Sequence, residues 1–169
     1  MTGTAQELPQ FEVFGGYSNM WANFTANNGN DFDVNGFNAS VRENFNSWFA
    51  GDLDFSSFFG SENGAKTNTQ TVSYGPVFSY RKHGNIVPFV RVMAGAERGG
   101  TNYMNISFPE WRLALMGGGG VDLKFNHNIS FRLIQVDYVM SQFSNARQDN
   151  LRLSAGVIFN LGRKHKDTW

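Results

Sequence analysis

The chain has 169 residues, with 14 basic and 14 acidic side chains and a formal net charge of zero. This balance excludes the basic surplus of a nucleic-acid-binding protein, and the lack of cysteine excludes disulfides, thiolate metal sites and cysteine nucleophiles. No run of about 18 apolar residues occurs, so the sequence predicts no transmembrane helix.

Apolar and polar residues alternate with a period of two along most of the chain, which predicts an all-β fold. Eight strands are expected, at about residues 10–20, 35–44, 48–60, 71–81, 88–97, 111–125, 129–143 and 150–161. Most of these segments are about twice the usual strand length of 5–6 residues. A tilted membrane-spanning strand needs roughly 9–11 residues, which these segments provide.

Residues 71–97 show the alternation most clearly and predict a long β-hairpin. Val72 and Tyr74 belong to an apolar face, while Thr71, Ser73 and Gly75 on the other face are small. After a polar break at residues 82–85 the pattern resumes, with Arg91 on the polar face. The hairpin therefore has one apolar face and one face that carries charged residues.

The seventh segment, residues 129–143, departs from strict alternation. The phase set by its second half places Arg132 on the apolar face. A β-bulge between Arg132 and Gln135 would restore the pattern. Alternatively, Arg132 lies close to a membrane interface.

The connections between the predicted strands alternate between short and long. Tight turns are expected at residues 45–47, 82–85 and 126–128. Longer polar loops are expected at residues 21–34, 61–69, 98–110 and 144–149. In an up-and-down meander this places the three tight turns and both termini at one end, and the four loops at the other. Long strands with this asymmetry are typical of outer-membrane barrels.

The polar face is sparse, rich in small residues and mixed in charge, which suits a narrow lumen where each charge meets a counter-charge. The predicted lumen ion-pair network consists of Glu12, Arg42, Asp52, Asp54, Arg91, Glu97, Asp122, Lys124, Asp137 and Arg152. An eight-stranded barrel is filled by its own side chains, so an open pore is not expected. Phe14, Trp48 and Phe89 have the parity of the polar face and are expected to fill the lumen or its rim.

The apolar face carries aromatic residues towards both ends of the strands, with aliphatic residues between them. Two aromatic girdles around an aliphatic band are typical of bilayer interfaces. The predicted interface aromatics near the long loops are Tyr17, Phe37, Phe59, Tyr74, Trp111 and Tyr138. Those near the short turns are Phe49, Tyr80 and Phe159.

No catalytic, cofactor-binding or metal-binding residue is predicted, and the chain is not expected to be an enzyme. Asp52 and Asp54 have the spacing of paired acid–base carboxylates, but no histidine accompanies them on their strand, which favours a lumen network with Arg42, Arg91 or Arg152. The three histidines, His83, His127 and His165, fall in predicted turns or in the C-terminal tail. The run of glycines at residues 117–120 lacks the lysine and helix of a phosphate-binding loop, which favours a bent barrel strand.

Several segments together resemble the eight-stranded transmembrane domain of the outer-membrane protein A (OmpA) family. They are FEVFGGYS at residues 11–18, SYGPVFSYR at 73–81, PFVRVMAGAERG at 88–99, GGGGVDLKF at 117–125, FRLIQVDY at 131–138 and LRLSAGVIFNLG at 151–162. The resemblance implies an outer-membrane location, periplasmic termini and an ion-paired lumen. The peptidoglycan-binding domain of that family has no counterpart in this sequence.

The expected organisation is an N-terminal periplasmic segment at residues 1–9, a barrel at 10–162 and a short basic tail at 163–169. The expected role is that of a structural or surface barrel whose loops serve adhesion or recognition. A small-solute channel and a soluble lipocalin-like barrel with inverted faces are the alternatives. The expected partners are outer-membrane lipid, lipopolysaccharide and an extracellular ligand of the loops, with no nucleic acid and no cofactor. The protein is expected to be a monomer that has lost a signal peptide.

Overall fold

The computed structural model describes residues 8–22, 32–62, 65–82, 84–103, 106–107, 110–142 and 147–162 of the chain. Every regular element in these ranges is a β-strand. The strands are β1 (Phe11–Ala22), β2 (Phe32–Asn44), β3 (Phe49–Glu62), β4 (Ala65–Ser79), β5 (Ile86–Tyr103), β6 (Ile106–Ser107), β7 (Glu110–Lys124), β8 (Ile129–Gln142) and β9 (Arg147–Leu161). No helix long and apolar enough to cross a membrane occurs among the described residues.

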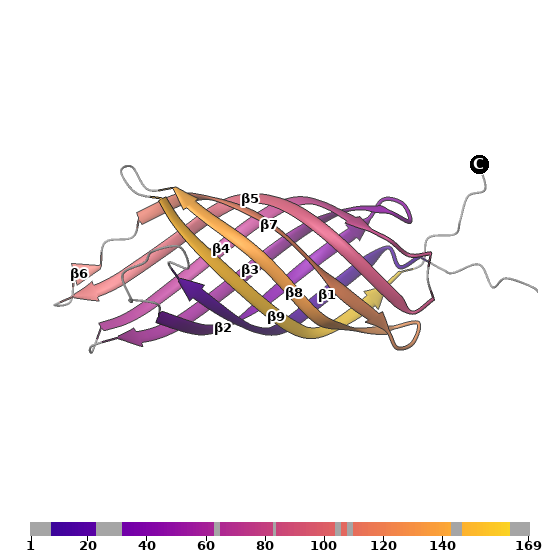
Figure 1. Cartoon of the computed structure of the whole chain (residues 1–169), viewed down its shortest axis with the longest axis horizontal. Helices are drawn as coiled ribbons and strands as arrows, with labels where there is room; N and C mark the ends of the chain where they lie inside the picture. Colours follow the sequence, from indigo (N-terminus) through magenta and orange to yellow (C-terminus); the bar gives the residue numbers. More distant parts are fainter. Residues whose placement is uncertain are drawn as a thin grey trace, which may run out of the picture.

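Eight long strands close into an antiparallel barrel (Figure 1). Each strand pairs with its neighbour in the chain, β1 pairs with β9, and the β4–β5 pairing completes the ring. The two-residue strand β6 pairs only with the far end of β5, beyond the barrel wall. The predicted all-β, eight-stranded up-and-down barrel is therefore confirmed.

Two of the predicted long loops are wrong. Most of residues 61–69 belongs to strands, because β3 continues to Glu62 and β4 starts at Ala65. Most of residues 98–110 is also strand, because β5 continues to Tyr103. Threonine-rich sequence such as Thr67-Asn68-Thr69 is compatible with a strand but has no apolar face, so alternation cannot reveal it. The connecting residues 23–31 and 143–146 lie outside the described part of the chain.

The predicted bulge in the seventh segment is confirmed. The pairing of β8 with β9 shifts register between Arg132 and Gln135. Leu133 and Ile134 consequently both face outwards, with 54% and 45% of their surfaces exposed. Arg132 is buried inside the barrel, so the alternative that placed it at a membrane interface is wrong.

Two of the tight turns are built in the same way. The side-chain Oδ1 atom of Asn46 accepts hydrogen bonds from the backbone N–H groups of Trp48 and Phe49, at 3.0 and 2.8 Å. Asn126 Oδ1 makes the equivalent bonds, at 2.9 Å to Asn128 and 2.7 Å to Ile129. An asparagine that bonds its own backbone in this way stabilises a turn.

The outer face of the barrel is apolar and the inner face is polar. Val92, Leu113 and Val90 have exposed fractions of 63%, 60% and 59%, whereas Asp54 and Asp137 are fully buried. A soluble barrel would present the opposite arrangement. The lipocalin-like alternative is therefore wrong.

The exposed aromatic side chains include most of those predicted for the membrane interfaces. Tyr17, Phe37, Phe59, Tyr74, Tyr80 and Phe159 are exposed, while Phe49 and Tyr138 are half-buried. The side chain of Trp111 lies outside the described residues. Because β4 begins earlier than predicted, Tyr74 lies nearer the short-turn end of its strand than the long-loop end.

Trp48 does not lie in the lumen, so its predicted position is wrong. It belongs to the turn between β2 and β3, where strand parity no longer applies, and 57% of its surface is exposed. Its ring stacks on Phe78 with a centroid separation of 6.0 Å and an interplanar angle of 15°. Trp48 therefore adds to the aromatic residues on the outer surface at the short-turn end.

Candidate functional site

The lumen is the candidate site, and its side chains change character along strands such as β1 and β8. From the short-turn end to the long-loop end, the buried residues of β1 are Glu12, Phe14, Ser18 and Met20. Those of β8 are Ser130, Arg132, Gln135, Asp137 and Val139. On these two strands polar, charged or aromatic residues lie nearest the short turns, a polar and ionic layer follows, and an apolar residue lies nearest the long loops.

A central ionic cluster of five residues spans the lumen. Its members are Asp52, Asp54, Arg91, Asp137 and Arg152, all at most 1% exposed. Arg91 donates to both oxygens of Asp137 at 2.9 Å and to Asp52 and Asp54 at 3.2 Å. Arg152 on β9 reaches Asp54 on β3 at 3.1 Å and Asp137 at 2.9 Å. Apart from the Arg152–Asp137 bond, these bonds connect strands that are not neighbours in the sheet.

A second group, the short-turn-end cluster, contains Glu12, Arg42, Arg81, Asp122 and Arg132. Arg132 makes a bidentate contact with Asp122, in which Nε donates to Oδ1 at 2.7 Å and Nη2 donates to Oδ2 at 3.0 Å. Glu12 accepts bonds from Arg81 at 2.7 Å and from Arg42 at 3.3 Å. Such charge-assisted contacts, with a planar guanidinium against a carboxylate, are the strongest hydrogen bonds available to side chains.

Arg42 links the two clusters and crosses the barrel. Its Nη2 atom lies 3.6 Å from Asp52 in the central ionic cluster, and its Nη1 atom lies 3.5 Å from Asp122 on the far wall. The guanidinium also stacks over the ring of Phe89 at 4.7 Å, and Arg132 covers Phe89 and Phe14 at 4.5 Å. The aromatic rings thus occupy lumen space and hold the arginines by cation–π contacts.

Apolar side chains occupy the lumen closer to the long loops. Met20, Val34 and Phe58 form one buried cluster, and Met93, Met116 and Val139 form another. Met116 also contacts the ionic layer, because its Sδ atom accepts from Arg152 Nη2 at 3.2 Å. An ionic layer and an apolar layer therefore both lie between the two ends of the barrel.

The ten residues predicted for the lumen network occupy three different environments. Eight of them belong to the two clusters just described: Glu12, Arg42, Asp52, Asp54, Arg91, Asp122, Asp137 and Arg152. Glu97 is buried nearer the long loops, opposite Arg112 in the β5–β7 register. Lys124 is only half-buried at the short-turn end and forms no ion pair with the described residues.

Sequence reasoning missed three residues of the lumen network. Arg81 follows β4 and carries the parity of the inner face, but it was assigned to the end of a strand without a partner. Arg132 was ambiguous until the bulge fixed its face. Gln135 bridges Arg132 and Asp137 with two 2.7 Å bonds, which its neutral side chain gave no reason to expect.

The chemistry open to this arrangement is ion pairing. Asp52 and Asp54 contact arginines, and no histidine of the described residues contacts them. Among the described residues no group of three or more histidine, aspartate or glutamate side chains is arranged to hold a metal ion. His127 lies in the β7–β8 turn, and His83 and His165 lie outside the described residues.

The glycine run in β7 lets the central ionic cluster approach the barrel wall. A Cβ atom on Gly118 would point inwards, 2.8 Å from the Cα of Asp137 and closer still to its carboxylate and to the carbonyl of Val136. A Cβ atom on Gly117 would point outwards and meet nothing within 4 Å. Of these two adjacent positions, only Gly118 therefore requires glycine.

We expect Gly118→Ala to lower the free energy of unfolding by about 1–3 kcal/mol, the usual cost of overpacking. Gly117→Ala should be neutral or should stabilise the protein by up to about 1 kcal/mol, because glycine in a strand loses more entropy on folding than alanine. Urea unfolding of both variants in micelles measures the difference. Equal stabilities would show that the wall beside Asp137 can relax.

A closed β-barrel with a lipid-compatible exterior and a charged interior is the architecture of an integral outer-membrane protein. The sequence model of the "Outer membrane protein beta-barrel domain" family matches residues 1–159. The chain belongs to this family and therefore to the bacterial outer membrane, and the predicted resemblance to OmpA-like barrels is confirmed. A search of the curated proteins finds no match.

Solved structures share the fold at low sequence identity. Neisserial surface protein A is 12% identical, with a TM-score of 0.77 over 90% of this chain and 97% of that one. Ail, the attachment invasion locus protein of Yersinia pestis, is 20% identical, with a TM-score of 0.61 over 89% and 99%. OprG of Pseudomonas aeruginosa is 9% identical, with a TM-score of 0.60 over 90% and 96%.

Proposed function

We propose that this protein is a structural and surface barrel of the outer membrane, with no catalytic site, cofactor or pore. The observation that carries this proposal is the set of arginines that cross the lumen. Arg42 on β2 contacts Asp122 on β7, and Arg152 on β9 contacts Asp54 on β3. A solute moving along the barrel axis would have to break buried ion pairs, at a cost of several kcal/mol.

The strands at the long-loop end support a surface role. β5 has 18 residues and β4 has 15, whereas a tilted strand crosses the hydrocarbon layer in roughly 9–11. β5 continues into its pairing with β6, which projects from one end of the barrel (Figure 1). We infer that this end faces the outside, that the short turns and both ends of the barrel domain at residues 10–162 face the periplasm, and that the barrel is a monomer embedded in lipid and lipopolysaccharide.

The exposed end would then act as a rigid platform for adhesion or recognition. A filled lumen holds the strands in place, so the loops between them have fixed anchor points. Ail of Yersinia pestis has been solved in complex with the heparin analogue sucrose octasulfate. Heparin is therefore a suitable first probe for this chain.

Two measurements on the refolded protein test the proposal. In planar bilayers we expect no stepwise conductance, with a large porin reconstituted in parallel as the positive control. In nanodiscs we expect binding to immobilised heparin or matrix glycoproteins, and loss of binding when residues 23–31 are replaced by a short Gly-Ser turn. Discrete conductance steps that change in Arg152→Ala would favour the small-solute channel instead. Binding that is unchanged by the loop replacement would remove this loop from the proposed surface.

A further inference from the structure

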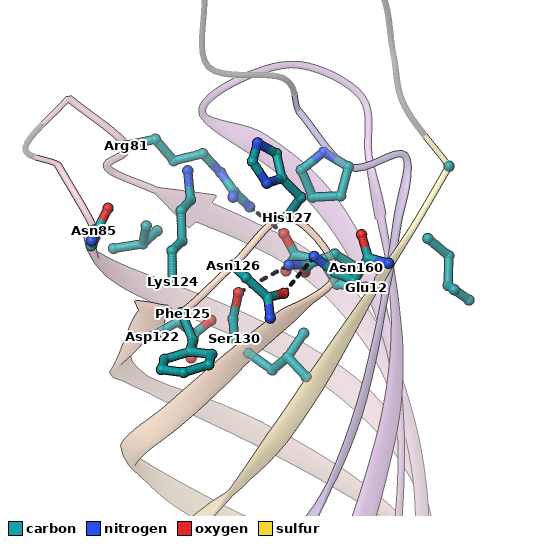
Figure 2. Close-up of a pocket in the computed structure, with 16 residues that line it drawn as sticks. Glu12, Arg81, Asn85, Asp122, Lys124, Phe125, Asn126, His127, Ser130 and Asn160 are labelled. Carbon is teal, nitrogen blue, oxygen red and sulfur yellow. Dashed lines mark hydrogen bonds and ion pairs between the residues drawn. The ribbon is translucent and has the colours of Figure 1, made fainter. Parts of the chain in front are cut away.

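A cavity of about 890 Å³ opens at the short-turn end of the lumen (Figure 2). We call it the short-turn vestibule. Its polar lining comes from Glu12, Arg81, Asp122, Lys124, His127 and Asn160. Its apolar lining includes Val87 and Ile158, which are buried, and Leu161. The volume is within the range of small-molecule sites, which are usually part apolar with a few convergent polar groups.

When the ion pairs of the two clusters are counted, one positive charge in the vestibule, that of Lys124, has no matching carboxylate in either cluster. The central ionic cluster has three carboxylates and two guanidinium groups, and Arg42 supplies its third positive charge through Asp52. The remaining members of the short-turn-end cluster balance each other, since Arg81 pairs with Glu12 and Arg132 pairs with Asp122. Lys124 has no carboxylate of its own among the described residues.

The two carboxylates that line the vestibule are already engaged. Both oxygens of Glu12 accept hydrogen bonds, Oε1 from Arg81 and Asn44 and Oε2 from Arg42. Both oxygens of Asp122 accept bonds from Arg132. The charges of both carboxylates are therefore offset by the arginines that they bond, including Arg81 in the cavity lining, and they repel an anion less than unpaired carboxylates would.

Arg81 and Lys124 have donor groups that no carboxylate of the described residues occupies, which favours an anionic ligand. The side chain of Arg81 is 92% buried, yet its Nε–H group has no hydrogen-bond partner in the part of the chain that the structure describes. Lys124 extends towards Arg81 in Figure 2, and the two cations repel each other electrostatically. Two like charges that face one cavity are stabilised when an anion binds between them. A guanidinium and an ammonium together match a carboxylate or phosphate group.

We propose that the short-turn vestibule binds a small organic anion, whose carboxylate or phosphate group contacts Lys124 and Arg81 and whose apolar part lies against Val87 and Ile158. The vestibule lies at the short-turn end of the barrel (Figure 2), so we expect the ligand to come from the aqueous side of the membrane and not from the lipid. This site is separate from the proposed recognition surface, which lies at the opposite end of the barrel.

Phenyl phosphate is a suitable probe because it combines a dianion with a compact apolar ring. Titration calorimetry in phosphatidylcholine nanodiscs should give saturable binding that weakens as salt is added. Inorganic phosphate alone should bind more weakly, because it lacks the apolar part. Lys124→Gln should weaken the binding of phenyl phosphate about tenfold or more, which is the effect of losing one charge-assisted hydrogen bond.

Lys82→Gln is the matched control, since Lys82 is an exposed lysine in the neighbouring turn and does not line the vestibule. It should bind phenyl phosphate as the parent protein does. Both variants are first checked for a heat-modifiable band on gels, which shows that the barrel has folded. Absence of saturable binding to the parent protein, or equal affinities of the two variants, would overturn the proposal. Equal affinity for inorganic phosphate and phenyl phosphate would overturn the role of Val87 and Ile158.

Discussion

Arg91→Glu is expected to destabilise the barrel by about 5 kcal/mol or to prevent refolding altogether. Arg91 is 1% exposed and contacts three carboxylates, those of Asp52, Asp54 and Asp137. Removing one partner of a buried ion pair costs about 3–5 kcal/mol, because the remaining charge is left buried without compensation. The reversal goes further, since it places a fourth carboxylate among these three.

Urea unfolding in micelles, followed by gel mobility with and without heating, measures this effect. Arg98→Glu is the matched control, because Arg98 lies on the same strand and is exposed. A charge reversal at an exposed position usually changes stability by less than about 1 kcal/mol. If the two variants unfold at the same urea concentration, the central ionic cluster does not stabilise the fold.

A variant that fails to refold gives no unfolding curve, so Arg91→Met serves as a milder test. Methionine keeps much of the volume and removes only the charge, and Met93 and Met116 already lie in the same region of the lumen. The expected loss is about 3–5 kcal/mol. In the double variant Arg91→Met/Asp137→Leu the loss should be smaller than the sum of the single losses, because no unpaired carboxylate of Asp137 remains.

The strands, and which of their residues face inwards or outwards, could be predicted because the two faces of this barrel contact different surroundings. Lipid on one side and a packed polar lumen on the other impose a period of two, which places Val92 outside and Arg91 inside without any further information. The same rule located the bulge in β8, because only an extra residue lets both Leu133 and Ile134 face the lipid. The pattern fails where the sequence of a strand has no apolar face, as in Thr67-Asn68-Thr69 of β4.

The partners within the lumen could not be predicted in the same way. Arg42 and Asp122 are 80 residues apart in the chain and meet only because the barrel closes with a particular stagger of its strands. Alternation gives the face of a residue but not its height along the barrel axis. It therefore placed ten charged residues on the inner face but left out Arg81 and Arg132, and it could not separate Lys124, at the vestibule, from the arginines of the clusters.

The alternation rule is unreliable in the turns, where it holds for one residue and fails for another. Trp48 was assigned to the lumen by parity, but the turn directs it to the outer surface, where it stacks on Phe78. Arg81, just past the end of β4, still follows the inner-face parity of that strand and bonds Glu12. Side-chain direction in a turn depends on local backbone angles, which a two-residue period does not contain.

Val92→Lys should lower the stability of the barrel in lipid by about 2–4 kcal/mol, the cost of a lysine at the bilayer midplane of a transmembrane barrel. Val92 faces outwards with 63% of its surface exposed, and its neighbour across the strand pair is Gly117. The outward neighbours of Val92 along β5 are Val90 and Ala94, and Leu115 is outward on the flanking strand β7, so none of these three positions offers a carboxylate to pair with the new charge.

Ile86→Lys supplies the comparison that isolates depth in the membrane. Ile86 lies on the same strand, also faces outwards and is 54% exposed, but it is the first residue of β5, beside the short turns. Lysine at an interface costs only about 0–1 kcal/mol, because its ammonium group can reach water. Unfolding of both variants in phosphatidylcholine vesicles should therefore separate them by about 2 kcal/mol or more.

The size of this separation tests the membrane position of the barrel and not only its fold. If the hydrocarbon layer is centred near Val92, the part of β5 that continues to Tyr103 extends beyond it on the long-loop side, as the proposed surface platform requires. If the two lysines cost the same, Val92 and Ile86 lie at equivalent depths, and the membrane would have to be centred closer to the short turns. A scan of lysine along the outward positions of β5 would then locate the layer directly, because the cost is largest at its middle.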